Sequence, residues 1–104
     1  MDPPLAENLL RLQMCWVYVI KSLKDGKLYI GSTRFDVDKR LQIHNRGSVR
    51  WTKSHRPWKL VYKEKFPNYT QARKRELFLK TGVGRKELQG ILRAGTQVDK
   101  GGRL

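Results

Sequence analysis

Residues 16–31, WVYVIKSLKDGKLYIG, predict a β-hairpin on which the rest of the fold is built. Segments 16–20 and 28–31 are rich in β-branched and aromatic residues, which favour strands, and Asp-Gly between them is a strong hairpin-turn signal. With Asp25 and Gly26 as the two turn residues, position 22 pairs with 29 and position 20 with 31. Because side chains alternate along a strand, one face is expected to carry Tyr18, Ile20, Ser22, Tyr29 and Gly31.

A helix and a third strand are predicted after the hairpin. The helix starts at the N-cap Asp36 and runs to about Asn45, ending near Gly47. Spacing of three and four residues places four side chains on its inward face: Val37, Arg40, Leu41 and His44. Residues 47–57 are expected to form a loop. Segment 58–66 alternates and predicts a strand with one solvated face, its apolar side holding Trp58, Leu60, Tyr62 and Phe66.

Two helices are predicted to complete the fold. The first has Thr70 as its N-cap and reaches about Lys80, with Gly82 ending it, and its inward stripe holds Ala72, Glu76 and Leu79. A short helix follows over 86–92. The order β-β-α-β-α-α indicates an α+β fold in which about three helices flank a three-stranded antiparallel sheet. The expected organisation is an extension at 1–13, a domain at 14–93 and a flexible tail at 94–104.

The charge balance points to an anionic partner. Lysine and arginine total 23 and aspartate and glutamate total 9, giving a net charge of +14 over 104 residues, so nucleic acid is the first candidate. No apolar run approaches the roughly 20 residues that a membrane helix needs. With Cys15 as the single cysteine, a reducing cytoplasm is expected, where such a protein would associate with the nucleoid.

One carboxylate stands apart as a candidate metal ligand. Most acidic residues fall at termini, turns or a helix cap, whereas Glu76 lies mid-helix on an inward face. One carboxylate completed by waters and substrate phosphate suits magnesium. An ion pair with Lys80, four residues further on, explains Glu76 equally well, and spacing alone leaves both interpretations open.

Four further residues are candidates for chemistry on a phosphodiester. Tyr18 and Tyr29 share a face beside Gly31; a phenol is a poor base at its usual pKa of about 10, but a strongly positive site can lower that value. Arg40 could clamp a phosphate oxygen, and His44 could move a proton or orient water. Taken singly, each also fits an ordinary structural role, as sheet packing, surface charge or a half-buried histidine.

This ordered set of residues resembles the GIY-YIG endonuclease family. Trp16-Val17-Tyr18 and Tyr29-Ile30-Gly31 match the paired motifs, with Trp16 replacing the first glycine. Arg40 and His44-Asn45 match the following helix, and Glu76 matches the later one. The similarity spans about residues 15–92 and is strongest to small stand-alone members related to the N-terminal nuclease domain of the bacterial excision-repair incision enzyme. The asparagine that many members carry near the domain's end is absent after Lys80.

The resemblance implies a metal-dependent endonuclease that cuts DNA. It would give Glu76 the metal (Mg²⁺ or Mn²⁺), Arg40 the phosphate, and one or both of Tyr18 and Tyr29 the activation of water. His44 would lie near the scissile phosphate. Substrate contacts are expected at Gly31, Thr33, Arg34, Arg50, Thr52, Lys53, Arg56 and Arg73.

The expected biological role is structure-directed cutting in DNA repair or recombination, with a protein partner as one route to targeting. RNA stays open as a substrate. Charge alone also supports a nucleic-acid-binding module with little or no catalysis, and more weakly a basic assembly domain. Loss of cleavage on replacing Glu76 would separate the first hypothesis from the second, and a protein partner held at high salt would indicate the third.

Overall fold

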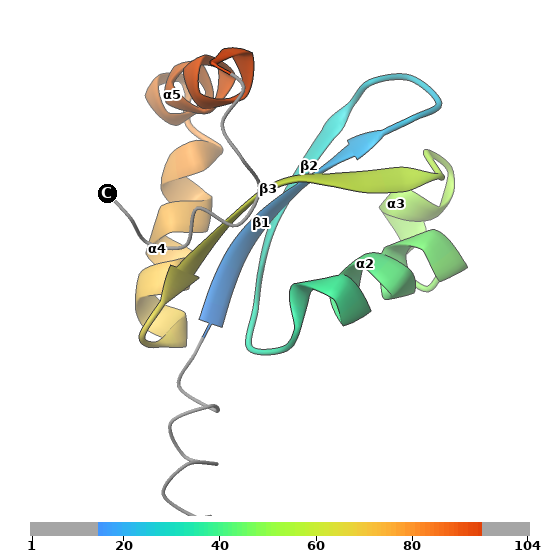
Figure 1. Cartoon of the computed structure of the whole chain (residues 1–104), viewed down its shortest axis with the longest axis horizontal. Coiled ribbons are helices and arrows are strands. Elements are labelled where there is room, and N and C mark those ends of the chain that lie inside the picture. Colours follow the sequence, from blue (N-terminus) through green and yellow to red (C-terminus); the bar gives the residue numbers. More distant parts are fainter. Residues whose placement is uncertain (1–14, 95–104) are drawn as a thin grey trace, which may run out of the picture.

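The computed structural model describes residues 15–94 and shows a three-stranded antiparallel sheet with helices on both faces (Figure 1). The strands are β1 (Cys15–Ser22), β2 (Leu28–Thr33) and β3 (Trp58–Phe66), in the order β2-β1-β3. The helices are α2 (Val37–Arg46), α3 (Arg50–Lys53), α4 (Tyr69–Leu79) and α5 (Gly82–Arg93). The predicted α+β class is confirmed. The predicted extension at 1–13 and all but the first residue of the predicted tail lie outside the described residues.

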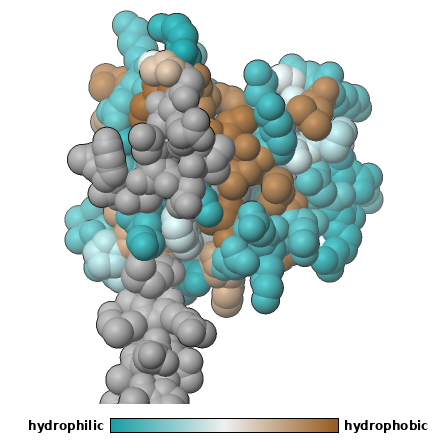
Figure 2. All heavy atoms as spheres, in the orientation of Figure 1, coloured by the Kyte–Doolittle hydropathy of each residue, from teal (hydrophilic) through white to brown (hydrophobic). Residues whose placement is uncertain are grey.

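The central strand β1 serves two hydrophobic clusters, one on each side of the sheet. Val17 and Val19 pack under α4 and α5 with Ala72, Leu79 and Leu88. Tyr18 and Ile20 point to the other side, with Val37, Trp58 and Leu41 on or near α2. In Figure 1, α4 and α5 lie to the left of the sheet and α2 and α3 to the right. Figure 2 shows hydrophilic side chains over most of the right-hand part of that view.

The hairpin forms with a register two residues away from the predicted one. Ile20 pairs with Tyr29 and Tyr18 with Gly31, because the loop has four residues rather than two. Ser22 sets this loop, since its hydroxyl accepts the N–H groups of Lys24 and Asp25 at 3.0 and 3.1 Å, and Gly26 closes it at a φ of 79°. A shift of two residues keeps every side chain on its predicted face.

Strand β3 does not present one apolar and one solvated face as predicted. Its pairing with β1 shifts between Val19 and Ile20: Val19 pairs with Tyr62, but Ile20 pairs with Leu60. The unmatched Val61 is a β-bulge, and a bulge reverses the alternation of the side chains that follow it. Trp58 and Leu60 therefore join the cluster beside α2, whereas Tyr62 and Phe66 join the cluster beneath α4 and α5.

Helix α2 follows its sequence signals closely. The Asp36 side chain accepts the Asp38 N–H as an N-cap, and Gly47 ends the helix at a φ of 87°. The segment that was predicted to be a loop contains the short helix α3, which has no side-chain cap at its start. Asn45 joins α2 to β3 by exchanging two hydrogen bonds with the main chain of Trp58, at 2.6 and 3.0 Å.

The last two helices begin earlier than predicted. Asn68, not Thr70, caps α4 by accepting the N–H of Gln71 at 2.9 Å. Gly82 does not end a helix but starts α5, because the hydroxyl of Thr81 accepts the Gly84 N–H at 3.0 Å. Gly84 lies so close to the end of α4 that an added Cβ would overlap the main-chain carbonyl of Phe78. This close approach fixes how α5 lies across α4.

Candidate active site

A buried chain of polar side chains lies on the α2 side of the sheet. The Tyr18 hydroxyl lies 2.9 Å from Nε2 of His44, whose Nδ1 lies 2.9 Å from Oγ1 of Thr52. Thr52 Oγ1 in turn lies 3.3 Å from the carbonyl oxygen of Val49, to which it donates. Tyr18 comes from β1, His44 from α2 and Thr52 from α3, and all three are almost fully buried.

The direction of these hydrogen bonds follows from the last of them. The Val49 carbonyl can only accept, so the Thr52 hydroxyl donates to it and accepts from Nδ1–H of His44. Nε2 of His44 then carries no proton and accepts a hydrogen bond from the Tyr18 hydroxyl. The chain thus fixes one tautomer of the imidazole and aims the phenol proton at it.

Burial keeps both rings of this chain neutral at pH 7. It raises the pKa of the Tyr18 phenol to about 12, and the guanidinium of Arg40 offsets only part of that rise. It also lowers the pKa of His44 to about 4, with the positive charge of Arg40 acting in the same direction. The expectation that the protein's positive charge would lower the pKa of this tyrosine is therefore wrong, because desolvation outweighs Arg40.

Acidification is expected to destabilise the protein through His44. Its folded pKa of about 4 lies below the ordinary 6.5, so the unfolded chain binds the proton more readily. This contribution is fully present above about pH 6.5 and falls as the pH drops toward 4, by up to about 3 kcal/mol. Urea unfolding of wild type and His44→Gln between pH 4 and 7.5 measures it. Identical pH dependence in the two proteins would contradict the assignment.

Gly31 makes room for Tyr18. The two residues pair across β1 and β2, and a Cβ on Gly31 would lie 2.6 Å from the Tyr18 hydroxyl oxygen. The second tyrosine, Tyr29, is only half-buried, and its ring centroid lies 4.8 Å from that of His44. Tyr29 therefore lies between the buried chain and the surface.

Glu76 is held at the opposite side of β2 by three donors. Ser32 Oγ donates to Oε1 at 2.5 Å, Arg73 lies 2.9 Å from the same oxygen, and Lys80 Nζ lies 2.7 Å from Oε2. Burial by itself would raise the pKa of Glu76, but the hydrogen bonds from Lys80, Ser32 and Arg73 outweigh it and hold the pKa below its ordinary value. The ion pair anticipated with Lys80 is present, and the carboxylate is ionised at neutral pH.

Arg40 and the surroundings of Glu76 meet at a small cavity. This cavity of about 160 Å³ is lined by Arg40 from α2, Ser32 and Thr33 from β2, and Tyr69 from α4. Ser32 connects the two sides, because its hydroxyl contacts Glu76 and lies 3.3 Å from the Tyr69 hydroxyl. The Arg40 guanidinium thus borders this opening at the end of β2, and the ionised carboxylate of Glu76 lies behind it, hydrogen-bonded to the lining residue Ser32. In this arrangement Arg40 could bind a phosphate, and Glu76 could bind a metal ion in place of Lys80 and Arg73.

The donor set around Glu76 fits a magnesium-type ion with one protein carboxylate. No group of three or more His, Cys, Asp or Glu side chains that could hold a metal occurs within residues 15–94, so water and phosphate oxygens would supply the other ligands, as magnesium prefers. The side chains of Lys80 and Arg73 are 42% and 49% exposed, against 5% for Glu76. Both cations can therefore move into solvent, and the buried carboxylate of Glu76 would then need another cation in their place.

The structure separates the other predicted contact residues into two groups. Exposed cations are Arg34, Arg50, Lys53 and Arg56, and Arg34 lies over the Tyr69 ring with 4.2 Å between its Cζ and the centroid. Thr33 and Thr52 are buried, although Thr33 lines the cavity of Arg40. Their hydroxyls are used internally, by the Phe35 N–H and by His44. Arg73 is exposed but pairs with Glu76.

Sequence reasoning missed Ser32 and Tyr69. Ser32 points to the side of the sheet opposite Tyr29 and Gly31, so the face expected to hold the site did not include it. The sequence did hold a signal for Ser32. It directly follows Gly31 on β2, so its side chain points toward the helix that carries Glu76. Tyr69 belongs to the first turn of α4, a turn that the predicted start at Thr70 left out.

The sequence model of the GIY-YIG catalytic domain matches residues 14–89. The chain belongs to the GIY-YIG family. GIY-YIG domains are typically nuclease domains. The match runs from the start of β1 into α5.

Relatives within the GIY-YIG family are similarly small. UPF0213 proteins of Staphylococcus saprophyticus and Staphylococcus aureus are each 42% identical over 77 residues, covering 73% of this chain and 92% of each relative. The solution NMR structure of a UPF0213 protein from Bacillus halodurans is 30% identical, with a TM-score of 0.45, and the match covers 75% of this chain and 84% of that one. Within residues 15–94, no helix has the length and apolar character needed to cross a membrane.

Proposed function

We propose that this GIY-YIG protein is an endonuclease that hydrolyses phosphodiester bonds of DNA with the help of one divalent metal ion, Mg²⁺ or Mn²⁺. The observation that carries the proposal is the ionised, nearly buried carboxylate of Glu76, which Ser32 links to the cavity that Arg40 lines. We place the activity in the cytoplasm, in structure-directed cutting during DNA repair or recombination, on the resemblance to the excision-repair nuclease domain. RNA cutting and a targeting partner are further options.

In the proposed mechanism, Arg40 binds a non-bridging oxygen of the scissile phosphate. Its planar guanidinium suits two parallel hydrogen bonds to such a group. Glu76 would hold the metal, which when bound stabilises charge on the phosphoryl and leaving oxygens. Ser32 keeps the carboxylate oriented, and Lys80 and Arg73 release it or turn toward DNA.

Tyr18 and His44 form the proposed proton path. The attacking water forms a bond to phosphorus and gives a proton to the Tyr18 oxygen, while the Tyr18 proton passes to Nε2 of His44. The P–O bond to the leaving group breaks, and that oxygen takes a proton from solvent. A phosphate bound at Arg40 offsets a positive charge that lowers the pKa of His44. Substrate binding therefore makes His44 a better proton acceptor.

A cleavage assay on labelled duplex, flap and branched DNA tests the proposal. Wild type is incubated with magnesium, with manganese, and with chelator, and products are resolved on a denaturing gel. Cutting that requires the metal supports the proposal. Chelator-resistant cutting would remove the metal from the mechanism, and intact DNA in every lane would remove the nuclease.

The salt dependence of DNA binding is expected to follow the number of phosphate contacts. For duplex DNA the slope of log K against log salt is about −0.9 per phosphate neutralised. Arg34→Ala should reduce its magnitude by about one, because Arg34 is exposed beside the cavity of Arg40. Lys59→Ala, on the opposite edge strand β3, is the charge-matched control and should leave it unchanged. Fluorescence anisotropy from 50 to 300 mM NaCl measures the slope for each variant. A slope for Arg34→Ala equal to that of wild type would mean that Arg34 does not contact the DNA backbone.

A DNA-binding module without catalysis is the second candidate function. One observation favours it: both oxygens of Glu76 already have cationic partners in Arg73 and Lys80, so the carboxylate can act as a structural counter-ion. In that case Glu76→Gln would weaken the contacts of Arg73 and Lys80, and neither wild type nor the variant would cut DNA.

A further inference from the structure

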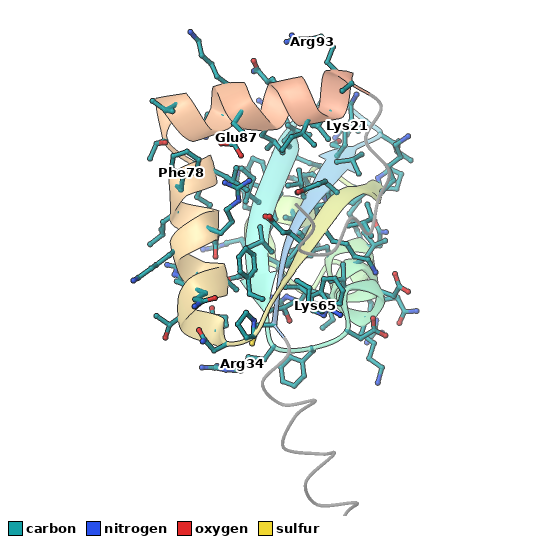
Figure 3. The ribbon with its side chains drawn as sticks, turned by 60° about the vertical axis from the view of Figure 1, so that its left-hand side comes forward. Lys21, Arg34, Lys65, Phe78, Glu87 and Arg93 are labelled. Atoms are coloured by element: carbon teal, nitrogen blue, oxygen red, sulfur yellow. The ribbon has the colours of Figure 1, made fainter. Side chains whose placement is uncertain are left out.

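A larger cavity opens along the free edge of the sheet. Its volume is about 540 Å³, and it is bordered by the first half of β2, by α5 and by Trp51 of α3. Figure 3 shows α5 lying across this end of the sheet and α4 running along β2. The volume falls in the range that takes a ligand the size of a mononucleotide.

The cavity is positively charged. The described residues that line it include Lys27, Lys80 and Arg85 but no aspartate or glutamate. Residues 27–30 form one wall. Within residues 15–94, β2 is an edge strand that pairs with β1 alone, so its outer edge offers main-chain N–H and C=O groups. The basic side chains suit an anionic ligand, and the main-chain groups suit one that also has hydrogen-bond donors and acceptors.

The aromatic wall is held in place before any ligand arrives. Trp51 is 47% exposed, and its ring is stacked on Tyr29 at 26° with 6.2 Å between centroids. The ring centroid of His55 lies 4.3 Å from that of Trp51, and Nδ1 of His55 lies 2.7 Å from the carboxylate of Asp25. A large ring that is half open to solvent and supported by its neighbours is a ready platform for a flat ligand.

The cavity adjoins the candidate active site at two points. Tyr29 lines it and contacts the ring of His44 at 4.8 Å. Lys80 also lines it and pairs with Glu76 at 2.7 Å. A nucleotide in this cavity would therefore be a near neighbour of a phosphate bound at Arg40.

From this geometry we infer that the cavity is a subsite for one unstacked nucleotide next to the phosphate that is cut. The inference rests on the proposed function and narrows its substrate to DNA with an unpaired base beside the cleavage position. Lys27, Lys80 and Arg85 hold the backbone phosphates, and the base stacks on Trp51. A base inside a continuous duplex cannot enter, because its neighbours cover both of its faces.

Binding without metal tests the subsite separately from catalysis. Fluorescence anisotropy in EDTA compares a labelled duplex carrying one central unpaired 2-aminopurine with the fully paired duplex of the same sequence. Wild type should bind the first about tenfold more tightly, the size of one base–aromatic stacking contact, and should quench the 2-aminopurine emission. Trp51→Ala should abolish both effects, whereas Trp51→Phe, which keeps a ring, should retain most of each.

Charge and folding controls complete the experiment. Arg85→Ala should weaken binding of the unpaired duplex severalfold, and Lys59→Ala, equal in charge but on β3, should not. Thermal unfolding of each variant shows whether α3 and α5 remain folded, and Trp51→Phe carries the test if Trp51→Ala unfolds. Equal affinity for both duplexes, or a preference unchanged in Trp51→Ala, overturns the subsite even if DNA is cut. Preference without cleavage at any metal concentration keeps the subsite and overturns the nuclease.

Discussion

Glu76→Gln is expected to reduce the rate of metal-dependent DNA cleavage at least about 1000-fold. The substitution keeps the shape of the side chain but removes the charge that would hold the metal, and a metal contributes several kcal/mol of transition-state stabilisation. DNA affinity should stay the same or rise by up to about threefold, because Arg73 and Lys80, which pair with this carboxylate, become available to phosphates. Single-turnover cleavage with saturating enzyme, together with anisotropy in EDTA, separates the two effects.

The control for this variant is Glu87→Gln, which removes the same charge from α5. Glu87 is paired with Arg75 at 2.7 Å, whereas Glu76 is bonded to the cavity residue Ser32, so the cleavage rate of Glu87→Gln should stay within about twofold of wild type. Manganese titration adds a direct reading, since Glu76→Gln should need much more manganese for any residual cutting. A Glu76→Gln protein that cuts as fast as Glu87→Gln would remove Glu76 from the mechanism.

Gly84→Ala is expected to destabilise the fold by about 3 kcal/mol or more. An added Cβ would overlap the Phe78 carbonyl and lie within 2.7 Å of the Leu79 Cα. These are main-chain atoms that cannot rotate away, so α5 has to shift and Leu88 loses part of its burial against α4. Chemical denaturation should show a lower midpoint with the same slope.

Gly90→Ala is the matched control within the same helix. Beyond the neighbouring backbone of α5, no atom of the described residues lies within 4 Å of a Cβ at Gly90, so alanine there gains helix propensity and should stabilise by up to about 1 kcal/mol. If Gly84→Ala lowers the free energy of unfolding and Gly90→Ala raises it, the loss comes from the close contact between α4 and α5. It does not come from replacing a helical glycine as such. Equal, small changes at both would mean that α5 does not approach α4 so closely.

Most of the fold was predictable from the sequence because strong local signals agreed with one another. Asp-Gly predicted the hairpin, and Asp36 with Gly47 predicted both ends of α2. What failed depended on competition between similar signals. Asn68 and Thr70 are both good caps, and the main chain enters the helix at the first. Helix α3 is four residues long without a side-chain cap, too short to show a period.

The bulge at Val61 and the hairpin register could not be predicted from the pattern. Residues 58–66 alternate in the sequence apart from Val61 and Glu64, and only the pairing with β1 shows that Val61 is left unmatched. The length of the hairpin loop depends on Ser22, whose hydroxyl accepts hydrogen bonds from two main-chain N–H groups. The Asp-Gly pair does not indicate that Ser22 takes part in the turn.

The sequence indicated the positions of Glu76, Arg40 and His44 but not Ser32, Tyr69 or the electrostatics of the candidate site. Helical spacing alone put Glu76 inward and placed Arg40 with His44, and the structure shows these positions. The pKa of Tyr18 depends instead on how deeply the phenol is buried beside His44, which composition does not reveal. Net charge acts at long range through solvent, whereas desolvation acts on the atoms next to the group.

The buried chain Tyr18–His44–Thr52 has a consequence for how this protein could be made more robust. It puts a phenol, an imidazole and a hydroxyl where the opposite side of the sheet holds valines and leucines. Apolar side chains of matching shape in such a place are often neutral or stabilising, so this half of the interior is not at its stability optimum. A thermostabilised version of the chain would be easiest to reach by repacking this half, and it would lose the proposed proton path on the way.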